Sequence, residues 1–492
     1  MLTGVSFEAI LAIVSGLLLL SILASRLSSR TGVPALLLFL AIGMLAGSDG
    51  PGQIAFDNPQ LTQSVGVIAL VLILFSGGLD TDWGRVRPVL APSLTLANVG
   101  VLVCAGLVGG FAAWVLGFGI LEGMLLGAII SSTDAAAVFS VMRSRDVRLK
   151  DDLEPVIEFE SGSNDPIAVF LTIGLISLIT TPGSSILSLI PQFVLQMGIG
   201  AVTGIGMGRM MAFVVNRLRL QEGIYPVATL ALVLLTYGGT SLIGGNGFLA
   251  VYLAGLTLGN RDFLHKRSLM RFHDGMAWLM QIAMFLTLGL QVYPSRLPPV
   301  AIDGLMLSAF LIFVARPVSV FVALAPFRFS TAAKLMISWT GLRGAVPIVM
   351  ATYPLLAGID RADAIFHLVF FVVLTSVLLQ GTTIPMIAKW LKLQDSRGHL
   401  FHYPQEFVPS VTMRSQLIEL RVAKGSTAEG SALMELGLPR GALVVAVTRE
   451  GEGLIPEGSM VFEAEDRVLV LGDREVLEGL PKLFASGGGA AA

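Results

Sequence analysis

The chain has 492 residues, of which 54% are hydrophobic and 13% are charged. Soluble domains carry about 25% charged residues, so this composition excludes an ordinary soluble protein and predicts a polytopic membrane protein. The net charge of -2 gives no indication of a nucleic-acid partner. A single cysteine, Cys104, excludes a disulfide framework within the chain.

Hydrophobic runs long enough to cross a hydrocarbon core of about 30 Å predict an all-α membrane region. The first run, residues 9–23, is followed by arginines and by no cleavage pattern, so we interpret it as a retained helix rather than a signal peptide. We predict thirteen transmembrane helices, at residues 6–25, 33–47, 61–79, 88–116, 119–142, 155–180, 187–216, 224–243, 246–260, 273–292, 300–326, 332–356 and 364–391.

The placement of basic residues supports this count. With the N-terminus outside, 19 lysines and arginines fall on the cytoplasmic side, and only Arg296 and Arg361 fall on the outer side. This bias follows the positive-inside rule, and one missing or additional helix would destroy the alternation. We therefore predict a multi-pass protein embedded in a lipid bilayer, with the N-terminus outside and a cytoplasmic C-terminus.

Residues beyond 392 are more charged and have a shorter hydrophobic period. Alternation over 416–422 and apolar runs at 442–447 and 467–471 predict three strands, whereas 431–436 and 474–484 predict short helices. About 80 residues suffice for one small domain. We expect a transmembrane domain at 1–392, a linker at 393–404, a small cytosolic α/β domain at 405–484 and a disordered tail at 485–492.

Four charged residues lie at similar depth inside predicted helices. Because a helix rises 1.5 Å per residue, Asp165 lies about 15 Å from the cytoplasmic end of its helix, and Asp134 about 13 Å from that end of its own. The same arithmetic places Arg343 and Arg316 about 16 and 17 Å deep. A charged side chain at the bilayer centre costs about 2.5–3.5 kcal/mol, so an intramembrane charge indicates an ion or proton pathway.

The run around Asp165 offers oxygen atoms on one helix face. Ser161 and Asp165 are four residues apart and share a face, whereas Glu160 and Asn164 share the adjacent one. Hard monovalent cations prefer oxygen ligands, which Asp165, Ser161 and Thr133 could supply together with backbone carbonyls and water. For Glu160 we favour a buried ion pair that holds the core.

Two predicted helices are interrupted near this depth. Residues 131–134 read Ser-Ser-Thr-Asp, and residues 340–347 combine two glycines with a proline. Irregular backbone at membrane depth is tolerated only where it lines a cavity inside the protein. Broken helices in corresponding places of two halves indicate an inverted-repeat transporter, here with repeats formed by helices one to six and eight to thirteen.

Plainer interpretations remain open for several of these residues. Asp165 could be a structural carboxylate paired with Arg316 or Arg343. The Thr133 hydroxyl could bond back to its own helix. Glu158 is expected at the level of the lipid headgroups.

The histidines give no metal site. His273 and His367 fall near the ends of their predicted helices and are expected to be solvated or interfacial, and His399 and His402 are too few to bind a metal. The sequence shows no nucleophile–base pair and no Walker loop, so neither an enzyme nor an ATP-driven pump is expected.

These residues resemble a known family. The run 160–166, Glu-Ser-Gly-Ser-Asn-Asp-Pro, resembles the Asn-Asp signature of NhaP-type monovalent cation/proton antiporters. Segments 132–135, 341–345 and 247–255 are similar to other stretches of that family, the first two to its unwound helix segments. Residues 438–472 resemble a TrkA-C (RCK-C) ligand-sensing domain. The combination implies the cell-volume-regulation branch, for which potassium/proton antiport is expected.

The resemblance implies an elevator-type homodimer in which Asp165 binds a cation and a proton in competition. It also implies an ion pair between Glu160 and an intramembrane arginine, either Arg316 or Arg343. Many relatives carry an acidic residue on the 61–79 helix where this chain has Ser76. We therefore predict an ion-binding set of Asp165, Asn164, Ser161, Thr133 and Asp134, with a monovalent cation at Asp165, Ser161 and Thr133.

The predicted function is secondary antiport of one H⁺ against one K⁺ or Na⁺, electroneutral and without a resident cofactor. A ligand-gated cation channel is the main alternative, although the sequence has no repeated Thr-Val-Gly-Tyr-Gly filter. A membrane-embedded sensor without flux is another. The cytosolic domain has no Gly-x-Gly-x-x-Gly run, and we expect it to dimerise and bind a small regulatory ligand such as a nucleotide or a cyclic dinucleotide.

Overall fold

The computed structural model describes residues 6–31, 34–145, 147–150, 153–218, 221, 223–394, 415–449, 452–477 and 479–484. The chain forms two compact units, Met1–Asp395 and Ser396–Ala492. Most of the predicted linker, the predicted tail, His399 and His402 lie outside the described residues.

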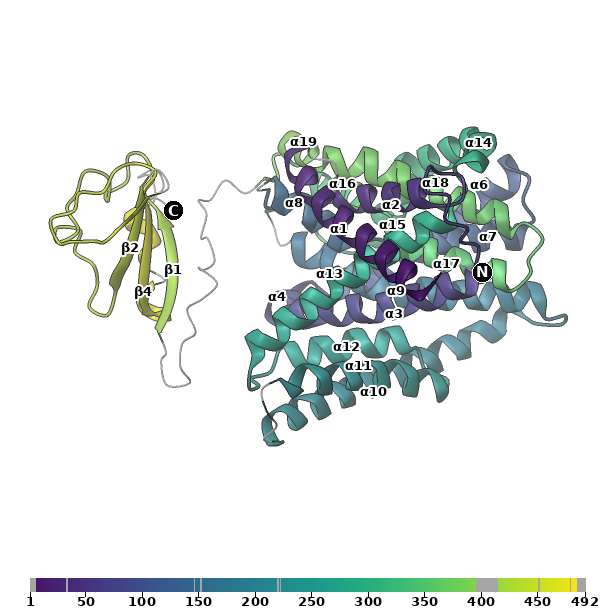
Figure 1. Cartoon of the computed structure of the whole chain (residues 1–492), viewed down its shortest axis with the longest axis horizontal. Helices are drawn as coiled ribbons and strands as arrows, with labels where there is room; N and C mark the ends of the chain where they lie inside the picture. The colour runs from purple at the N-terminus through teal and green to yellow at the C-terminus, as the bar shows by residue number, and fades with distance from the viewer. Residues whose placement is uncertain are drawn as a thin grey trace. The chain divides into compact units, whose positions relative to one another are not determined.

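The first unit is built from helices (Figure 1). They are α1 (Phe7–Thr31), α2 (Ala35–Ala46), α3 (Pro59–Asp80), α4 (Trp83–Val86), α5 (Leu90–Thr95), α6 (Val101–Val115), α7 (Ile120–Ile129), α8 (Ala135–Ser144), α9 (Leu153–Thr180), α10 (Leu189–Arg217), α11 (Ile224–Leu242), α12 (Gly247–Gly259), α13 (Lys266–Gln291), α14 (Leu297–Phe310), α15 (Arg316–Ala323), α16 (Thr331–Trp339), α17 (Ala345–Leu356), α18 (Ala362–Ser376) and α19 (Thr382–Trp390). Short 3₁₀ turns occur at η1 (Arg87–Val89), η3 (Ile186–Ser188) and η4 (Pro294–Arg296), and π-helical segments at η2 (Leu96–Gly100), η5 (Leu311–Ala315) and η6 (Val377–Gly381).

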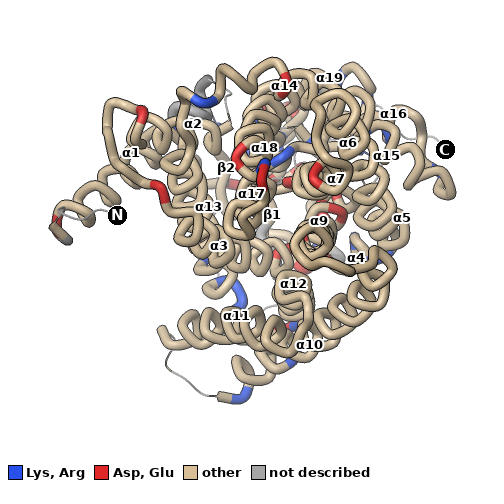
Figure 2. The backbone as a smooth tube through the Cα atoms, turned by 90° about the vertical axis from the view of Figure 1, so that its right-hand side faces the viewer, with Lys and Arg blue, Asp and Glu red and all other residues tan. Residues whose placement is uncertain are grey.

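Each of the thirteen predicted segments coincides with one helix or with consecutive helices of the structure. Within the described residues, eight helical stretches are long and apolar enough to cross a membrane, and α2, α7, α12 and α17 are shorter apolar helices. Seen from the side, charged residues form only short coloured segments along the mostly tan tube (Figure 2). The all-α membrane architecture is thus confirmed, and the number of crossings stays a prediction.

Both predicted helix interruptions are present. The first separates α7 from α8 at residues 130–134, and the second separates α16 from α17 at residues 340–344. A further irregularity, one of the three π-helical segments, is η5, which ends directly before Arg316. Such single-turn bulges rotate the residues that follow them and are frequent at functional sites.

Helices α3, α12 and α13 form one wall around these interruptions. Two glycines set the spacing, because a Cβ atom at Gly78 would collide with the carbonyl oxygen of Tyr252, and one at Gly255 with that of Phe75. Small residues allow helix backbones to approach closely in a membrane, where burial of apolar surface gives little drive for association. Helices α10 and α11 lie beside α12 (Figure 1, Figure 2).

The second unit contains a four-stranded antiparallel sheet of order β1-β4-β2-β3. Its strands are β1 (Ser415–Arg421), β2 (Leu443–Arg449), β3 (Glu452–Leu454) and β4 (Arg467–Asp473). The three predicted strands correspond to β1, β2 and β4, and the sequence prediction missed β3. A core that includes Val447, Phe462 and Val468 is fully buried beneath the sheet.

Two helix predictions in this unit were wrong. Residues 431–436 form turns and an isolated bridge, because the N–H groups of Leu433 and Met434 donate to carbonyls of Met460 and Gly458 instead of to their own turn. Residues 474–484 form only two four-residue helices, α20 (Arg474–Leu477) and α21 (Pro481–Phe484). Proline cannot donate the backbone bond that would continue one helix through this stretch.

Candidate functional site

Helix α9 carries the predicted Asn-Asp run through the middle of the helical unit. The helix is unbroken, although it contains Pro166, and the side chains of Glu160, Asn164 and Asp165 are buried. Proline removes one helix hydrogen bond. The carbonyl of Pro166 itself accepts a bond from Nδ2 of Asn246 at 3.0 Å, which ties α9 to the start of α12.

The two helix interruptions meet next to α9. The N–H of Asp134 donates to the carbonyl of Leu342 at 2.8 Å, so one broken segment is hydrogen-bonded to the other. Asp134 also caps α8, because its Oδ1 accepts the N–H of Ala137 at 3.0 Å. A Cβ at Gly344 would overlap the Asp134 carboxylate. The crossing, which is the place where residues 130–134 and 340–344 meet, therefore requires glycine at position 344.

Arg343 fills the centre of the crossing and is 1% exposed. Its Nη1 donates to the carbonyls of Ser131 and Ser132 at 2.8 and 2.7 Å, two acceptors in the interruption between α7 and α8. Its own N–H donates to Oγ of Ser376 at 3.1 Å. In the described part of the chain no carboxylate forms an ion pair with Arg343. A positive charge therefore sits on the crossing without a direct negative partner.

Asp165 faces the first interruption. Its Oδ1 accepts a hydrogen bond from Oγ of Ser132. The structure gives Asp165 no ion pair with Arg316 or Arg343 within the described ranges, so the paired structural carboxylate considered above is not what is observed. Ser132 was not among the predicted site residues. Its place beside Thr133 and Asp134 in the broken segment was the only signal that could have indicated it.

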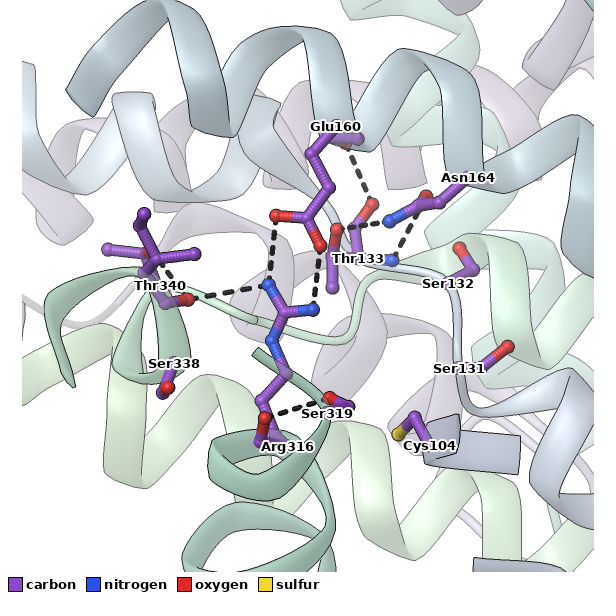
Figure 3. A network of polar contacts seen from close by, with 12 residues as sticks. Cys104, Ser131, Ser132, Thr133, Glu160, Asn164, Arg316, Ser319, Ser338 and Thr340 are labelled. Atoms are coloured by element: carbon purple, nitrogen blue, oxygen red, sulfur yellow. Dashed lines mark hydrogen bonds and ion pairs between the residues drawn. The ribbon is translucent and has the colours of Figure 1, made fainter. Parts of the chain in front are cut away.

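Three further predicted residues connect α9 to the same segment. Oγ of Ser161 donates to the carbonyl of Thr133 at 2.8 Å and accepts the N–H of Ala135 at 2.9 Å. Nδ2 of Asn164 donates to Oγ1 of Thr133 at 2.6 Å (Figure 3). The Thr133 hydroxyl thus faces α9, and the hydroxyl of Ser161 satisfies the first N–H of α8.

The glutamate of the run pairs with Arg316. Nη1 and Nη2 of Arg316 donate to Oε1 and Oε2 of Glu160 at 2.6 and 2.9 Å, a two-pronged arrangement that Figure 3 shows at the centre. Both side chains are buried, and Nη2 also lies 3.3 Å from the carbonyl oxygen of Ile337. A Cβ at Gly341 would contact the Arg316 side chain. Of the two arginines predicted as partners, the structure selects Arg316.

A cavity of about 610 Å³ leads to this centre. Its inner end is lined by Asp165, Asp134, Thr133 and Ser161, and its outer part by Asp80, Arg143, Glu158, Tyr252 and Asp274. Asp80 and Arg143 are exposed, whereas Asp165 is 5% exposed. The site is therefore reached through a cavity whose lining includes several charged side chains.

Two expectations for single residues were wrong. His273 and His367 are buried rather than interfacial. His273 bonds to Oγ1 of Thr229 at 2.9 Å, and His367 to the carbonyl of Asp363 at 2.7 Å. Glu158 is partly exposed and accepts a hydrogen bond from Oγ1 of Thr81 at 2.6 Å, and its depth relative to the headgroups stays a prediction.

Comparison with known proteins identifies the family. Residues 15–390 match the model of the transmembrane sodium/hydrogen exchangers, and residues 417–485 match the TrkA-C domain. The chain belongs to the sodium/hydrogen exchanger family. The predicted resemblance to this transporter family, which is not a family of enzymes, is thereby confirmed.

Individual relatives agree with this assignment. The exchanger is 43% identical to the K(+)/H(+) antiporter NhaP of Alkalimonas amylolytica, over 93% of this chain and 80% of that protein. It is 40% identical to the K(+)/H(+) antiporter NhaP2 of a Shewanella species (strain MR-4), over 94% of this chain and 81% of that protein. The fold is similar to that of the sodium proton antiporter MjNhaP1 of Methanocaldococcus jannaschii, with a TM-score of 0.67 and 24% sequence identity. The similarity covers 76% of this chain and 99% of the MjNhaP1 chain. The protein is accordingly a multi-pass cation/proton exchanger.

Proposed function

We propose that this exchanger carries one H⁺ against one K⁺ across the bacterial inner membrane, and that Asp165 is the group at which the two ions compete. The K⁺ assignment is supported by the relatives with 40–43% identity, which are named as K⁺/H⁺ antiporters. The observation that carries the proposal is a buried carboxylate at the end of a cavity, bonded to Ser132 and without a basic partner in the described residues.

Burial makes Asp165 a site of alternating occupancy. An isolated carboxylate in a low-dielectric interior costs several kcal/mol, and it becomes tolerable when a proton or a cation neutralises it. A proton and a cation cannot both occupy the same carboxylate oxygens, so binding of one releases the other. Competition at one group couples the two fluxes without a second transported-ion site.

The neighbouring oxygen atoms suit a monovalent cation. The carboxylate of Asp165, Oγ of Ser161 and the carbonyl of Thr133 come from both sides of one interface between α9 and the broken segment. Group I cations are bound by oxygen ligands, as harder divalent ions are. Asp134 lines the same end of the cavity, and Asn164 holds the Thr133 hydroxyl in place.

The charges at the crossing favour one-for-one exchange. Glu160 and Arg316 neutralise each other, and Arg343 offsets one of the two aspartates at the inner end of the cavity. With both aspartates ionised the remaining charge is minus one. One proton or one monovalent cation restores neutrality, so both loaded forms carry the same charge and the exchange is electroneutral.

Reconstitution tests this proposal. Full-length protein in proteoliposomes with an enclosed pH dye is expected to show proton movement on addition of K⁺, and Asp165→Asn is expected to abolish it. Asp360→Asn, which changes an exposed loop carboxylate, is the matched control and should retain wild-type rates. Undiminished exchange by Asp165→Asn would refute the proposal, and K⁺ current without proton movement would indicate the channel alternative.

We further propose that the protein is a homodimer and that its TrkA-C domain regulates exchange by binding a small ligand. The match of residues 417–485 to the TrkA-C model supports the second part. A chain ending at Gln394 is expected to retain exchange and to lose any response to nucleotides. Loss of all transport by a folded truncation would contradict a purely regulatory role.

A further inference from the structure

The second interruption is spanned by two side chains from another helical stretch. It separates Trp339, the last residue of α16, from Arg343, which lies two residues before α17 begins. Oγ of Ser376 accepts the N–H of Arg343 at 3.1 Å. Nε2 of Gln380 donates to the carbonyl of Trp339 at 2.9 Å. Oγ of Ser376 also donates to Oε1 of Gln380 at 2.6 Å, so the two side chains form a continuous link across the break, the Ser376–Gln380 bridge.

The two ends of the bridge fix the direction of every hydrogen bond in it. A backbone N–H can only donate and a backbone carbonyl can only accept, so the bonds run from Arg343 to Trp339. The Gln380 amide must therefore turn its NH₂ group toward Trp339 and its oxygen toward Ser376. Aligned hydrogen bonds strengthen one another in a low-dielectric interior. The bridge thus requires a hydroxyl group at position 376 and an amide at position 380.

Both residues of the bridge are buried deep in a membrane-spanning stretch. Ser376 is 0% exposed and Gln380 is 2% exposed. Gln380 lies ten residues before the end of the span Ala362–Trp390, which is about 15 Å along the helix axis. The same arithmetic predicts this depth for Asp165. A buried amide is costly unless its polar atoms are bonded, so the partners of Gln380 indicate what it is for.

Gln380 lies in the π-helical segment η6, where the helix departs from α geometry. Single-turn π segments of this kind are rare and are frequent at functional sites. The segment also packs against the break, because a Cβ atom at Gly381 would lie 3.9 Å from the side chain of Leu342. The irregular turn of one helix is therefore placed beside the irregular backbone of another, and the bridge joins them.

The bridge bears on transport through Arg343. The guanidinium of Arg343 binds the carbonyls of Ser131 and Ser132, and within the described residues no carboxylate forms an ion pair with it. The position of its backbone therefore decides where its charge lies, and the bond to Ser376 fixes that backbone. The proposed cation ligands come from α9 and the first interruption, so the bridge contacts none of them.

We propose that Ser376 and Gln380 are positioning residues for exchange, which hold the second interruption in the geometry that places the Arg343 charge on the first. This inference rests on the proposed function, in which that charge offsets one of the two aspartates at the inner end of the cavity. Neither residue binds the transported ion. Loss of the bridge should therefore slow exchange without weakening the apparent affinity for the cation, because the cation ligands stay in place.

Transport kinetics of full-length protein in proteoliposomes test the bridge, with ⁸⁶Rb⁺ as a tracer for K⁺. Gln380→Met keeps the length of the side chain and removes its amide, and it is expected to lower the maximal rate about tenfold without raising the apparent KM. Thr382→Val is the matched control, because this exposed hydroxyl bonds only to carbonyls of its own helix, and it should show wild-type kinetics. A wild-type maximal rate in Gln380→Met would overturn the inference, whatever its KM.

A double-mutant cycle separates positioning from general damage to the fold. If the bridge acts through Arg343, Gln380→Met should slow the Arg343→Gln protein less than about twofold, whereas independent losses would multiply. Ser376→Ala removes only one hydroxyl and should give the same pattern, so it decides the question if Gln380→Met does not yield folded protein. Equal slowing by the bridge variant in both backgrounds would overturn the inference. Persistent exchange by Asp165→Asn would instead refute the proposed role of Asp165.

Discussion

The ion pair between Glu160 and Arg316 permits a quantitative test of a structural role. We expect Glu160→Gln to destabilise the protein strongly, because it leaves the Arg316 guanidinium buried without a negative partner. The side chains of Glu160 and Arg316 are only 2% and 4% exposed, so water cannot replace the lost carboxylate. The double variant Glu160→Gln/Arg316→Gln removes both charges and should recover part of the lost stability.

The magnitude follows from burial and geometry. Removal of one partner of a buried, doubly hydrogen-bonded pair costs about 3–5 kcal/mol, whereas removal of both charges is often far less costly. An unfolding entropy of about 2.1 cal/mol/K per residue, over roughly 390 residues, converts this loss to about 4–6 °C in Tm. The double variant should lie within about 2 °C of the wild type.

Thermal unfolding of detergent-solubilised protein, followed by loss of the monodisperse chromatographic peak, measures these shifts. Asp303→Asn provides a control, since this carboxylate is exposed on α14. Equal Tm values for wild type and Glu160→Gln would refute the reasoning. So would a double variant less stable than the single one, because that result would mean that the two charges do not act as a pair.

Three further predictions concern the crossing and the second unit. Gly344→Ala is expected to abolish exchange in the proteoliposome assay, because the added Cβ overlaps the Asp134 carboxylate. Gly110→Ala on α6 is the control: its Cβ meets no atom within 4 Å, so this variant should retain exchange. Arg343→Gln removes the charge that binds the carbonyls of Ser131 and Ser132, and it should reduce exchange at least tenfold in that assay. A wild-type rate in this variant would contradict a role for the charge. Burial alone would raise the pKa of Asp466, but the hydrogen bonds from Arg449 and from the N–H of Glu463, together with the charge of Arg449, outweigh burial and hold this pKa below its usual value. The pair should therefore stabilise the sheet above about pH 4 and lose this effect as the pH falls through the lowered pKa. At neutral pH, Arg449→Gln should speed amide hydrogen exchange in β2 and β4 of the full-length protein. At strongly acidic pH, the variant and the wild type should exchange at the same rate.

Sequence patterns predicted the helices and the level of the site because both depend on one-dimensional quantities. Hydrophobic length gives the spans, and a fixed rise per residue places Asp165 and Arg343 at one depth. Clusters of glycine, serine and threonine indicated both interruptions. The same reasoning could not choose between Arg316 and Arg343 as the partner of Glu160, since depth says nothing about rotation around a helix axis.

Other features depend on contacts between distant segments and left little trace in the sequence. Asp274 lies near the charged start of α13, where an aspartate normally faces water, and only the packing of α3 against α13 brings it to Ser76. Burial of His273 has the same origin. In the second unit, the hydrogen bonds of Leu433 go to another segment, so local helix propensity failed there.

The balance of charges at the crossing has a thermodynamic consequence. A membrane potential of 100 mV is worth about 2.3 kcal/mol for each unit charge that crosses, but an exchanger whose two loaded forms carry equal charge gains nothing from it. For the proposed one-for-one exchange of H⁺ and K⁺, a tenfold difference in K⁺ concentration would be balanced by a difference of one pH unit, whatever the voltage. Under the proposed exchange, cells that keep K⁺ concentrated by their membrane potential would release K⁺ and take up acid until the two gradients match.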